Sequence, residues 1–469
     1  MDMYFWETKE EYYDRIFLLS DQGESVTYQQ RDEICERMQK EIKQGELAFI
    51  LCRNTIGSVL SYFACLKNRT IPLLLDAKMD YDMIKNLIKE YEPDTLFYPE
   101  DQEDLWKKFG QKGMSHEFGY CIRHQAKKEP TKVYDELALL LTTSGSTGSP
   151  KLVRQSYQNI QSNAESIAQY LHLDKEERPI TTLPMHYTYG LSIINSHALC
   201  GATILLTEHG LFEQEFWDFL KKEKATSFGG VPYTYEMLKR LKFFDMDLPY
   251  LKTMTQAGGK LAKHLHQEFA QYAKDTGKEF IVMYGQTEAT ARMSYLPAKD
   301  SIRKAGSIGI AIPGGKIEIE DGELVYYGEN VTLGYAQNKE DLKKGDERGG
   351  RLKTGDMARV DEEGYYYIVG RKKRFLKVLG NRINLDEVEQ ILKARYKECE
   401  LACAGIDDHL YIYVEEENVP DKEEIISFIS EKTGLNPGVF EVFCIDHIPV
   451  SESGKIKYKE LEDLKCHMK

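Results

Sequence analysis

The first two thirds of the chain alternate short apolar runs with amphipathic stretches, and this alternation constrains the fold more than any other feature. Residues 47–52, 71–75 and 95–98 are apolar runs of strand length, while residues 56–66 and 81–91 carry apolar side chains at helical spacing. Strands that alternate with helices predict βαβ units and a mostly parallel sheet covered on both faces. Ligands of such sheets bind at the carboxyl ends of the strands.

The alternation returns once and then gives way to a different pattern. It covers residues 202–241 and ends at a short strand, residues 280–284. Short alternating strands follow: residues 316–320 and 323–327 flank Asp321-Gly322, a pair that is typical of a hairpin turn.

The last part of the chain predicts a separate α+β unit. After residue 385 the pattern indicates a helix, two strands, a helix and a strand, and the basic run Arg371-Lys372-Lys373-Arg374, where we place a hinge, precedes them. We therefore predict an α/β fold. A large N-terminal domain of βαβ layers plus a small β-barrel-like part spans residues 1–372, and a small α+β C-terminal domain spans residues 373–469.

Composition and charge exclude several classes of protein. A formal net charge of −14 argues against sequence-independent nucleic-acid binding, which relies on clustered Lys and Arg. The first residues show no signal peptide, and no apolar stretch approaches the length of a membrane span. The nine cysteines are scattered without a CxxC pair, which is typical of a reducing compartment and predicts a cytoplasmic protein.

The segment from Thr142 to Lys151 has the chemistry of a phosphate-binding loop. It reads Thr-Thr-Ser-Gly-Ser-Thr-Gly-Ser-Pro-Lys and follows an apolar run. Its two glycines allow close approach of the backbone to a ligand, its hydroxyl groups can donate to phosphate oxygens, and Lys151 adds a positive charge. It is not a Walker loop, because GxxxxGK[ST] is absent. By composition alone, a flexible surface loop explains it equally well.

The order of residues in this loop resembles the signature of the AMP-forming adenylating superfamily. That family contains acyl-CoA and aryl-CoA synthetases, the adenylation domains of peptide synthetases, and beetle luciferases. Four further blocks resemble its motifs in the same order: Tyr284-Gly285-Gln286-Thr287-Glu288, Thr354-Gly355-Asp356, Gly370-Arg371 through Lys377 with Gly380 and Arg382-Ile383, and Ser453-Gly454-Lys455-Ile456.

The resemblance implies that the chain joins a carboxylic acid to ATP as an acyl-adenylate, with release of pyrophosphate, and then passes the acyl group to a thiol. It implies catalytic roles for Lys455, Thr147 and Glu288, with Mg²⁺ held by Glu288 and Thr147. Two anions must meet in this reaction, so positioning and cationic stabilisation should dominate catalysis. Mg²⁺ suits phosphate oxygens and often needs only one protein carboxylate.

The resemblance also implies the residues that bind the nucleotide. Tyr284 would stack on adenine, and Asp356 would accept hydrogen bonds from the ribose hydroxyls. Taken singly, Tyr284 could be a core tyrosine and Thr354-Gly355-Asp356 a common turn. The predicted nucleotide-binding set is Thr143, Ser144, Gly145, Ser146, Thr147, Gly148, Lys151, Gly258, Tyr284, Gly285, Gln286, Thr287, Asp356 and Arg371.

The small C-terminal domain is expected to be mobile about a hinge at Lys373. In the family, one orientation presents the lysine that matches Lys455 for adenylation, and the other presents the segment after the hinge for thiol attack. Gly380 would then line the path of a pantetheine arm. The chain departs from many relatives in having Val450, not Arg, after Pro449. This leaves open how the Lys455 loop is anchored.

A further block, from Pro184 to Leu191, resembles the family's substrate segment. Amino-acid adenylating relatives carry an Asp here, and this chain has His186 and Tyr187 instead, which disfavours α-amino acids. Gly190 and Ala289 are expected to leave room, while Tyr187, Tyr189 and Tyr233 fill it. We therefore predict a small aromatic acid or a short to medium acyl acid. His186 could equally be a satisfied core histidine. The predicted acid-binding set is His186, Tyr187, Gly190, Val231, Tyr233, Ala257, Gly258, Gly259, Ala289 and Met293.

The sequence does not determine which thiol accepts the acyl group. CoA is the leading prediction, and the phosphopantetheine of a separate acyl or aryl carrier protein is the alternative. A third hypothesis is a nucleotide-binding regulatory protein that has lost catalysis. It is disfavoured because Lys455, Glu288, Thr147 and Asp356 are all present.

Overall fold

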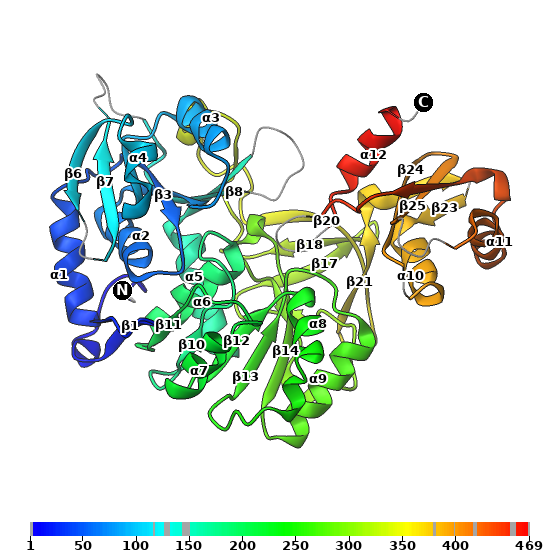
Figure 1. The fold of residues 1–469 in the computed structure, drawn as a ribbon, viewed down its shortest axis with the longest axis horizontal. Helices are drawn as coiled ribbons and strands as arrows, with labels where there is room; N and C mark the ends of the chain where they lie inside the picture. The colour runs from blue at the N-terminus through cyan, green and yellow to red at the C-terminus, as the bar shows by residue number, and fades with distance from the viewer. Residues whose placement is uncertain are drawn as a thin grey trace. The chain divides into compact units, whose positions relative to one another are not determined.

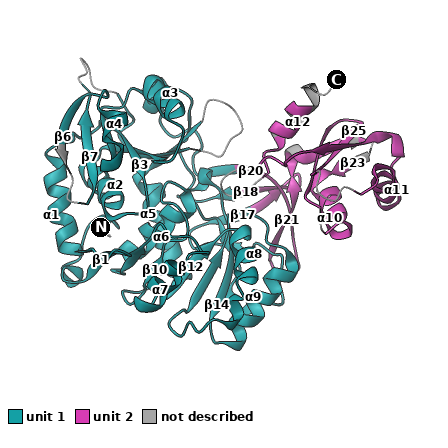
Figure 2. Ribbon diagram, in the orientation of Figure 1, with its two compact units in different colours: residues 1–143, 149–317, 326–352 teal, residues 144–148, 318–325, 353–469 magenta. Residues whose placement is uncertain are grey.

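The structure is a computed structural model, and it describes residues 3–115, 118–125, 132–142, 151–378, 381–397, 399–415, 420–450 and 456–467. Contacts divide the chain into two compact units, shown in Figure 2. The first consists of the described residues up to 317 together with 326–352, and the second consists of residues 318–325 and those described from 353 onward. We place the boundary between residues 372 and 373 because we expect a hinge there. A division into compact units does not test a hinge, so this boundary stays a prediction.

A nine-stranded mixed sheet forms one half of the first unit (Figure 1). Six of its strands, from β14 to β1 in the order below, run parallel, and β2, β15 and β16 pair antiparallel at the two edges. Its order is β16 (Ile310–Ala311), β15 (Ser294–Tyr295), β14 (Glu279–Tyr284), β13 (Thr253–Gln256), β12 (Ser227–Gly230), β10 (Pro179–Ile180), β11 (Ile204–Leu206), β1 (Ile16–Ser20) and β2 (Ser25–Thr27).

An eight-stranded mixed sheet forms the other half. Its centre is parallel, and antiparallel strands lie on both sides of that centre. Its order is β19 (Gly334–Ala336), β9 (Leu152–Ser156), β8 (Leu137–Thr142), β4 (Ile71–Asp76), β3 (Leu47–Cys52), β5 (Thr95–Pro99), β7 (Tyr120–His124) and β6 (Gln111–Ser115).

Helices fill the space between the two sheets and cover their outer faces. One core cluster joins residues of both sheets with α1 (Tyr28–Gln39), α2 (Ile56–Asn68), α5 (Tyr157–Tyr170) and α6 (Thr188–Leu199). Helix α2 is buried along nearly its whole length, as expected for a helix enclosed by apolar layers.

The outer helices pack on two different sheets. Helices α3 (Tyr81–Tyr91) and α4 (Glu103–Trp106) pack on the other face of the eight-stranded sheet. Helices α8 (Pro232–Arg240) and α9 (Lys263–Asp275) pack on the nine-stranded sheet through Tyr235, Phe269 and Phe280. Helix α7 (Gln214–Lys222) completes the helices of the first unit. The mostly parallel layered architecture is thus confirmed.

The small β-rich part predicted after the βαβ layers corresponds to a four-stranded sheet. Its order is β17 (Lys316–Glu320), β18 (Glu323–Tyr327), β20 (Arg351–Val360) and β21 (Tyr366–Arg371). Both predicted hairpin strands have the bounds that the sequence indicated.

The C-terminal part is the predicted α+β unit. A hairpin of β22 (Phe375–Val378) and β23 (Asn381–Asn384) precedes a three-stranded sheet with its helices. The further elements are α10 (Leu385–Arg395), β24 (Leu401–Ile406), β25 (His409–Glu415), α11 (Lys422–Thr433), β26 (Phe440–Ile445) and α12 (Tyr458–His467). No helix in the described ranges is long and apolar enough to cross a membrane.

Candidate functional site

Three neighbouring parallel strands, β12, β13 and β14, end at the same edge of the nine-stranded sheet. The loops that follow them carry Val231, Ala257 to Gly259, and Gly285 to Glu288. Gly258 has a φ of +83°, and a Cβ on it would lie 2.7 Å from the Tyr187 hydroxyl and 3.1 Å from Cγ1 of Val231. The structure therefore brings Tyr187, Val231 and Gly258, which the sequence placed in one pocket, into contact.

The segment after β14 folds back on itself, and Gly285 is the residue that permits this. A Cβ on Gly285 would lie 1.6 Å from the carbonyl oxygen of Ala291, so no other residue fits without rearrangement. Thr290 and Ala291 both have positive φ, 49° and 93°, which is strained for residues with a side chain. The Met293 amide donates to the Tyr284 carbonyl at 2.9 Å and closes the loop.

Asn330 holds this strained loop in place. Its side-chain amide nitrogen donates to the carbonyls of Ala289 and Arg292, each at 2.8 Å, and its backbone carbonyl accepts from the Thr290 hydroxyl at 2.8 Å. The Tyr326 hydroxyl donates to Asn330 Oδ1 at 2.8 Å. A buried side chain with all these bonds keeps the loop in a conformation that its own backbone does not favour.

Glu288, the predicted metal ligand, is anchored through both its backbone and its side chain. Its carbonyl accepts from the Thr332 amide at 3.1 Å and from Arg348 Nη1 at 3.0 Å. Its Oε1 accepts from the Tyr335 hydroxyl at 2.7 Å. Burial, with the Glu288 charge beside it, raises the pKa of Tyr335 to about 12, so the hydroxyl stays protonated and donates.

Tyr335 also brings Lys151 to the same place. Strand β19, which carries Tyr335, pairs antiparallel with β9, which begins just after Lys151. Nζ of Lys151 lies 5.5 Å and the Arg348 guanidinium 4.7 Å from the centre of the Tyr335 ring. A predicted phosphate-binding cation and a predicted metal-binding carboxylate thus meet on one tyrosine. Tyr335 and Arg348 were not predicted, because nothing in their sequence context distinguishes them.

The substrate segment follows β10 and continues into the first turn of α6. Asn54 holds it with two bonds, to the Met185 amide at 3.0 Å and from its own amide to the Leu183 carbonyl at 3.1 Å. His186 Nε2 lies 3.9 Å from Oδ2 of Asp76 at the end of β4. This carboxylate gives His186 a partner of its own.

Gly190 does not leave room for an acid, contrary to our expectation. A Cβ there would lie 2.3 Å from the Pro184 carbonyl oxygen, so the space beside Gly190 is filled by the chain itself. Its role is to let α6 approach the preceding loop.

The other predicted acid-binding residues differ in exposure. Ala289 and Met293 are fully buried, Ala257 is nearly so, and Tyr233 at the start of α8 is about half exposed (54%). A Cβ on Gly259 would lie 3.0 Å from the Pro232 ring. Contact of any of these residues with an acid stays a prediction.

Five residues of the predicted nucleotide set, Gly258, Tyr284, Gly285, Gln286 and Thr287, also lie at this edge. Tyr284 ends β14 and is half-buried, and Gln286 Nε2 donates to its hydroxyl at 3.4 Å. Thr287 begins the short 3-10 helix that contains Glu288, and its carbonyl accepts from Gln155. The predicted residues Thr143, Ser144, Gly145, Ser146, Thr147 and Gly148 lie outside the described residues, as does Lys455.

The two predicted ribose-binding residues lie together in the second unit. Asp356 on β20 is directly opposite Arg371 on β21, with Oδ1 3.7 Å from Nε. Asp356 is buried, whereas the Arg371 side chain is 65% exposed. Lys372 pairs with Glu323 at 2.8 Å, and this bond and one from the Gly355 amide lower the pKa of Glu323 although burial opposes them. Of Lys373 the structure describes only the backbone, in a short 3-10 helix.

The segments that flank the Lys455 loop are anchored by a buried arginine. Val450 bridges to Ile456, and the Lys457 amide donates to the Pro449 carbonyl at 2.8 Å. The next residue, Tyr458, stacks at 3.6 Å on Arg374, the last residue of the basic run. Arg374 therefore anchors the segment that follows the Lys455 loop.

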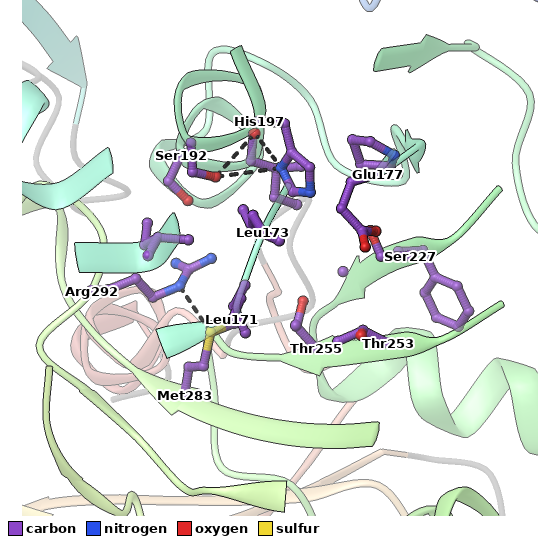
Figure 3. A pocket seen from close by; sticks show the side chains of 16 residues that line it. Leu171, Leu173, Glu177, Ser192, His197, Ser227, Thr253, Thr255, Met283 and Arg292 are labelled. Carbon is purple, nitrogen blue, oxygen red and sulfur yellow. Dashed lines mark hydrogen bonds between the residues drawn. The ribbon is translucent and has the colours of Figure 1, made fainter. Parts of the chain in front are cut away.

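A cavity lies between the nine-stranded sheet and helices α5 and α6 (Figure 3). Polar side chains are at both ends: Arg292 near Thr255, and Glu177 with His197 near Ser227. The His197 Nδ1–H donates to the Ile193 carbonyl at 2.8 Å, while Nε2 is buried without a partner among the described residues. Burial lowers the pKa of His197 to about 4, so the ring is neutral at pH 7.

Fold and site together define a layered α/β protein with a charged, glycine-lined site at its strand ends. The chain belongs to the AMP-binding enzyme family, which matches residues 5–336. It is 24% identical over 457 residues to a 2-succinylbenzoate–CoA ligase of Listeria monocytogenes, with 94% of this chain and 95% of the relative covered. It is 29% identical over 345 residues to an oxalate–CoA ligase of Arabidopsis thaliana, with 69% and 66% covered.

Solved structures share the fold. O-succinylbenzoate coenzyme A synthetase from Bacillus subtilis, in complex with ATP and magnesium ion, superimposes with a TM-score of 0.78 at 22% identity. The match covers 96% of this chain and 97% of that one. The same synthetase has been solved with the acyl-adenylate intermediate, with a TM-score of 0.75.

Proposed function

We propose that this enzyme activates a carboxylic acid with ATP, through an acyl-adenylate and with release of pyrophosphate, and then transfers the acyl group to the thiol of CoA. The observation that carries the proposal is the meeting of Lys151 and Glu288 on Tyr335 in a member of the AMP-binding family. These residues belong to two motifs that are far apart in sequence and are implied to handle the same phosphates.

In the first step a carboxylate oxygen attacks the α-phosphorus of ATP, and the bond to the pyrophosphate oxygen breaks. Both reactants are anions, so the enzyme has to supply positive charge and hold the two groups in line. We assign the β- and γ-phosphates to Thr143–Gly148 and Lys151, and the reacting carboxylate and α-phosphate to Lys455.

Magnesium fits the residues that we assign to it. Glu288 offers a hard oxygen donor whose orientation is fixed by the Tyr335 hydroxyl, and Thr147 would add a hydroxyl oxygen. When bound, the ion neutralises charge on the phosphate oxygens. The bonds from Thr332 and Arg348 to the Glu288 backbone carbonyl keep this residue in place.

The remaining nucleotide contacts follow the motifs. Tyr284 stacks on adenine with Gly258 and Gly285 close to it, and Asp356 and Arg371 bind the ribose. We propose residues 1–372 as the adenylate-forming domain and residues 373–469 as a mobile domain that turns about Lys373 between the two steps. A turn of this kind needs few residues to absorb it.

The acid is proposed to bind beside Tyr187, Val231 and Gly258, where the structure forms a close contact. A small aromatic or short to medium acyl acid suits this position, and an α-amino acid does not. Relatives named for 2-succinylbenzoate and oxalate show that family membership alone does not determine the acid. CoA is the acceptor that the names of these ligases favour. A carrier protein presents the same thiol and is the alternative.

The test is pyrophosphate exchange into ATP with a panel of carboxylic acids, followed by addition of CoA or of a carrier protein to the reactive acid. We expect exchange with at least one acid and an acyl-CoA product. Folded protein that exchanges with no acid would instead be a nucleotide-binding regulator, and acylation of the carrier alone would replace CoA as the acceptor.

A second arm of the same experiment uses Lys455→Ala. Loss of one charge about 4 Å from the reacting groups costs about 4 kcal/mol at an effective dielectric near 20, so exchange should fall about a thousandfold. Thiolysis of a supplied acyl-adenylate should be much less affected. An equal fall in both steps would contradict the two-orientation account.

A further inference from the structure

Arg292 follows the Glu288 loop and directs a buried guanidinium into the cavity of Figure 3. The residue is only 3% exposed. In the part of the chain that the structure describes, no carboxylate lies within 4.0 Å of the guanidinium. A guanidinium cannot lose its proton in a protein, so this charge has to be tolerated where it lies.

The other buried arginines differ from Arg292 in this respect. Among the described residues four more arginines are buried, and each has a carboxylate partner: Arg31 with Asp32 at 2.9 Å, Arg123 with Glu103 at 2.5 Å, Arg154 with Glu347 at 2.5 Å and Arg374 with Glu389 at 3.1 Å. Burying an ion is costly unless an opposite charge compensates it. Arg292 is therefore an exception within its own protein.

The groups that do surround Arg292 carry no charge at neutral pH. Its Nε–H points to Sδ of Met283 at 3.3 Å, and the guanidinium stacks at 3.8 Å on the ring of Tyr189. Burial raises the pKa of Tyr189 to about 12, and burial likewise raises the pKa of the nearby Tyr170. Contact with an aromatic face offsets part of the cost of burial, but it does not supply an anion.

The backbone of Arg292 is held firmly, so the side chain has a defined position. The Arg292 carbonyl accepts from the Asn330 amide at 2.8 Å and from Asn163 at 3.1 Å. Asn330 also fixes Ala289, next to Glu288. The guanidinium is thus tied to the loop that carries the predicted metal ligand, and it extends from that loop into the cavity.

The cavity is electrically uneven along its length. Its end near Arg292 and Thr255 is positive, while its other end has the Glu177 carboxylate and the unpartnered lone pair of neutral His197. Glu177 is occupied by Lys252, at 3.4 Å, and by the Thr226 hydroxyl, so it is not available to Arg292. An anionic group entering the cavity would be stabilised beside Arg292 and repelled from the far end.

We propose that Arg292 binds a second carboxylate of the acid that the enzyme activates, so that the substrate is a dicarboxylic acid. This inference rests on the proposed function. A planar guanidinium can bind a carboxylate through two parallel hydrogen bonds, which gives both affinity and orientation. The bound carboxylate would provide the opposite charge that the other buried arginines have within the chain.

The experiment compares pairs of acids that differ only in the second carboxylate, such as butyrate with succinate, hexanoate with adipate and benzoate with phthalate, by kcat/KM for pyrophosphate exchange. We expect the wild type to prefer one dicarboxylate over its partner at least tenfold. Arg292→Gln should lower kcat/KM for that dicarboxylate about a hundredfold, since one partner of a buried charge pair is lost. It should change the value for the monocarboxylate only a few-fold, and Arg292→Lys should lie between.

The control is Arg123→Gln, which removes a buried guanidinium from the eight-stranded sheet, far along the chain from the cavity residues. It should leave the ratio between the two acids as in the wild type, even if the thermal midpoint falls. Equal loss of both acids in Arg292→Gln, or a wild-type preference for monocarboxylates, would overturn this inference and leave the proposed function standing. Absence of exchange with every acid would overturn both.

Discussion

Tyr335 shows how one side chain can prepare a site that the motifs only outline. It donates to Glu288 at 2.7 Å, and its ring contacts the cations of both Lys151 and Arg348. A hydrogen bond from the Tyr335 hydroxyl fixes the orientation of the Glu288 carboxylate. We therefore regard Tyr335 as the positioning residue for the predicted magnesium ligand.

Tyr335→Phe keeps the ring and removes only the hydroxyl. A hydrogen bond to a charged group contributes about 1.5–3 kcal/mol, so the rate of pyrophosphate exchange should fall about tenfold to a hundredfold. More Mg²⁺ should be needed to reach half of the maximal rate, because Glu288 is no longer oriented. The measurement is a magnesium titration of the exchange rate.

The matched control for that titration is Tyr91→Phe. The Tyr91 hydroxyl donates at 3.1 Å to the carbonyl of Ala336, on the same strand as Tyr335, but has no contact with Glu288. The Tyr91→Phe substitution should lower the free energy of unfolding by about 1 kcal/mol and leave the magnesium dependence of exchange unchanged. A Tyr335→Phe enzyme with the wild-type magnesium dependence would refute the positioning role.

At the scale of elements, Arg374 joins three parts of the second unit. Its guanidinium pairs with Asp386 and Glu389 of α10, donates to the Cys403 carbonyl of β24 at 2.9 Å, and stacks on Tyr458 of α12. The Tyr458 hydroxyl donates a hydrogen bond to Oε2 of Glu389 at 3.1 Å. This cluster connects the helix after the Lys455 loop to the sheet of the same unit.

Arg374→Gln should destabilise these elements together. It leaves the buried Glu389 carboxylate with Lys393, 3.0 Å away and 40% exposed, as its remaining cation. Breaking a buried pair typically costs about 3–5 kcal/mol, and because Lys393 remains we expect a loss at the lower end, about 3 kcal/mol. Hydrogen exchange should show lost protection in β24, α10 and α12, and urea unfolding should show a transition at lower urea.

Arg395→Gln provides the comparison on α10, the helix whose carboxylates pair with Arg374. Arg395 and Glu424 lie 3.6 Å apart and are both more than half exposed, so their pair contributes less than about 1 kcal/mol. The two variants should differ clearly in urea midpoint. Equal midpoints would mean that Arg374 is not the anchor.

At the scale of the whole molecule, acid should unfold the chain in part through Glu103. The bond from the Tyr98 hydroxyl at 2.5 Å and the Arg123 guanidinium at 2.5 Å, against the effect of burial, lower the pKa of Glu103 to about 2. A carboxyl whose pKa is lower in the folded than in the unfolded state stabilises the fold above its unfolded pKa. That contribution is lost as the pH falls toward the folded value.

Glu103→Gln should therefore be less stable than the wild type at pH 7, and the difference should shrink between about pH 4.5 and 2. The measurement is the free energy of unfolding in urea at several pH values. Asp104→Asn, whose carboxylate is almost fully exposed beside Lys107, should show no such trend. If the difference in free energy of unfolding between the wild type and Glu103→Gln stayed constant down to pH 2, the lowered pKa of Glu103 would be contradicted.

Much of the fold could be predicted because periodicity is a local property. The bounds of β3, α3, β17 and β18 agree with the predicted ranges residue for residue. Helix α6 was not predicted, because a helix buried on all sides has no polar face and so no amphipathic pattern.

Strand β9 was missed for a related reason. Its residues include Arg154 and Gln155, both buried, which a sequence pattern assigns to the surface. Arg154 can be buried only because Glu347, from a distant part of the chain, pairs with it. A partner so far away leaves no trace in the local sequence.

The sequence by itself determined the layered α/β architecture, the family motifs and the glycines that their turns require, because these depend on residues close together in the chain. Only the tertiary structure decided which side chains meet: Tyr335 with Glu288 and Lys151, Asn330 with the loop after β14, and Arg292 with the uncharged side chains of Tyr189 and Met283. It also reassigned Gly190 from making room for an acid to packing α6. Contacts of this kind depend on how strands far apart in sequence pair, and burial then makes the presence or absence of a partner costly.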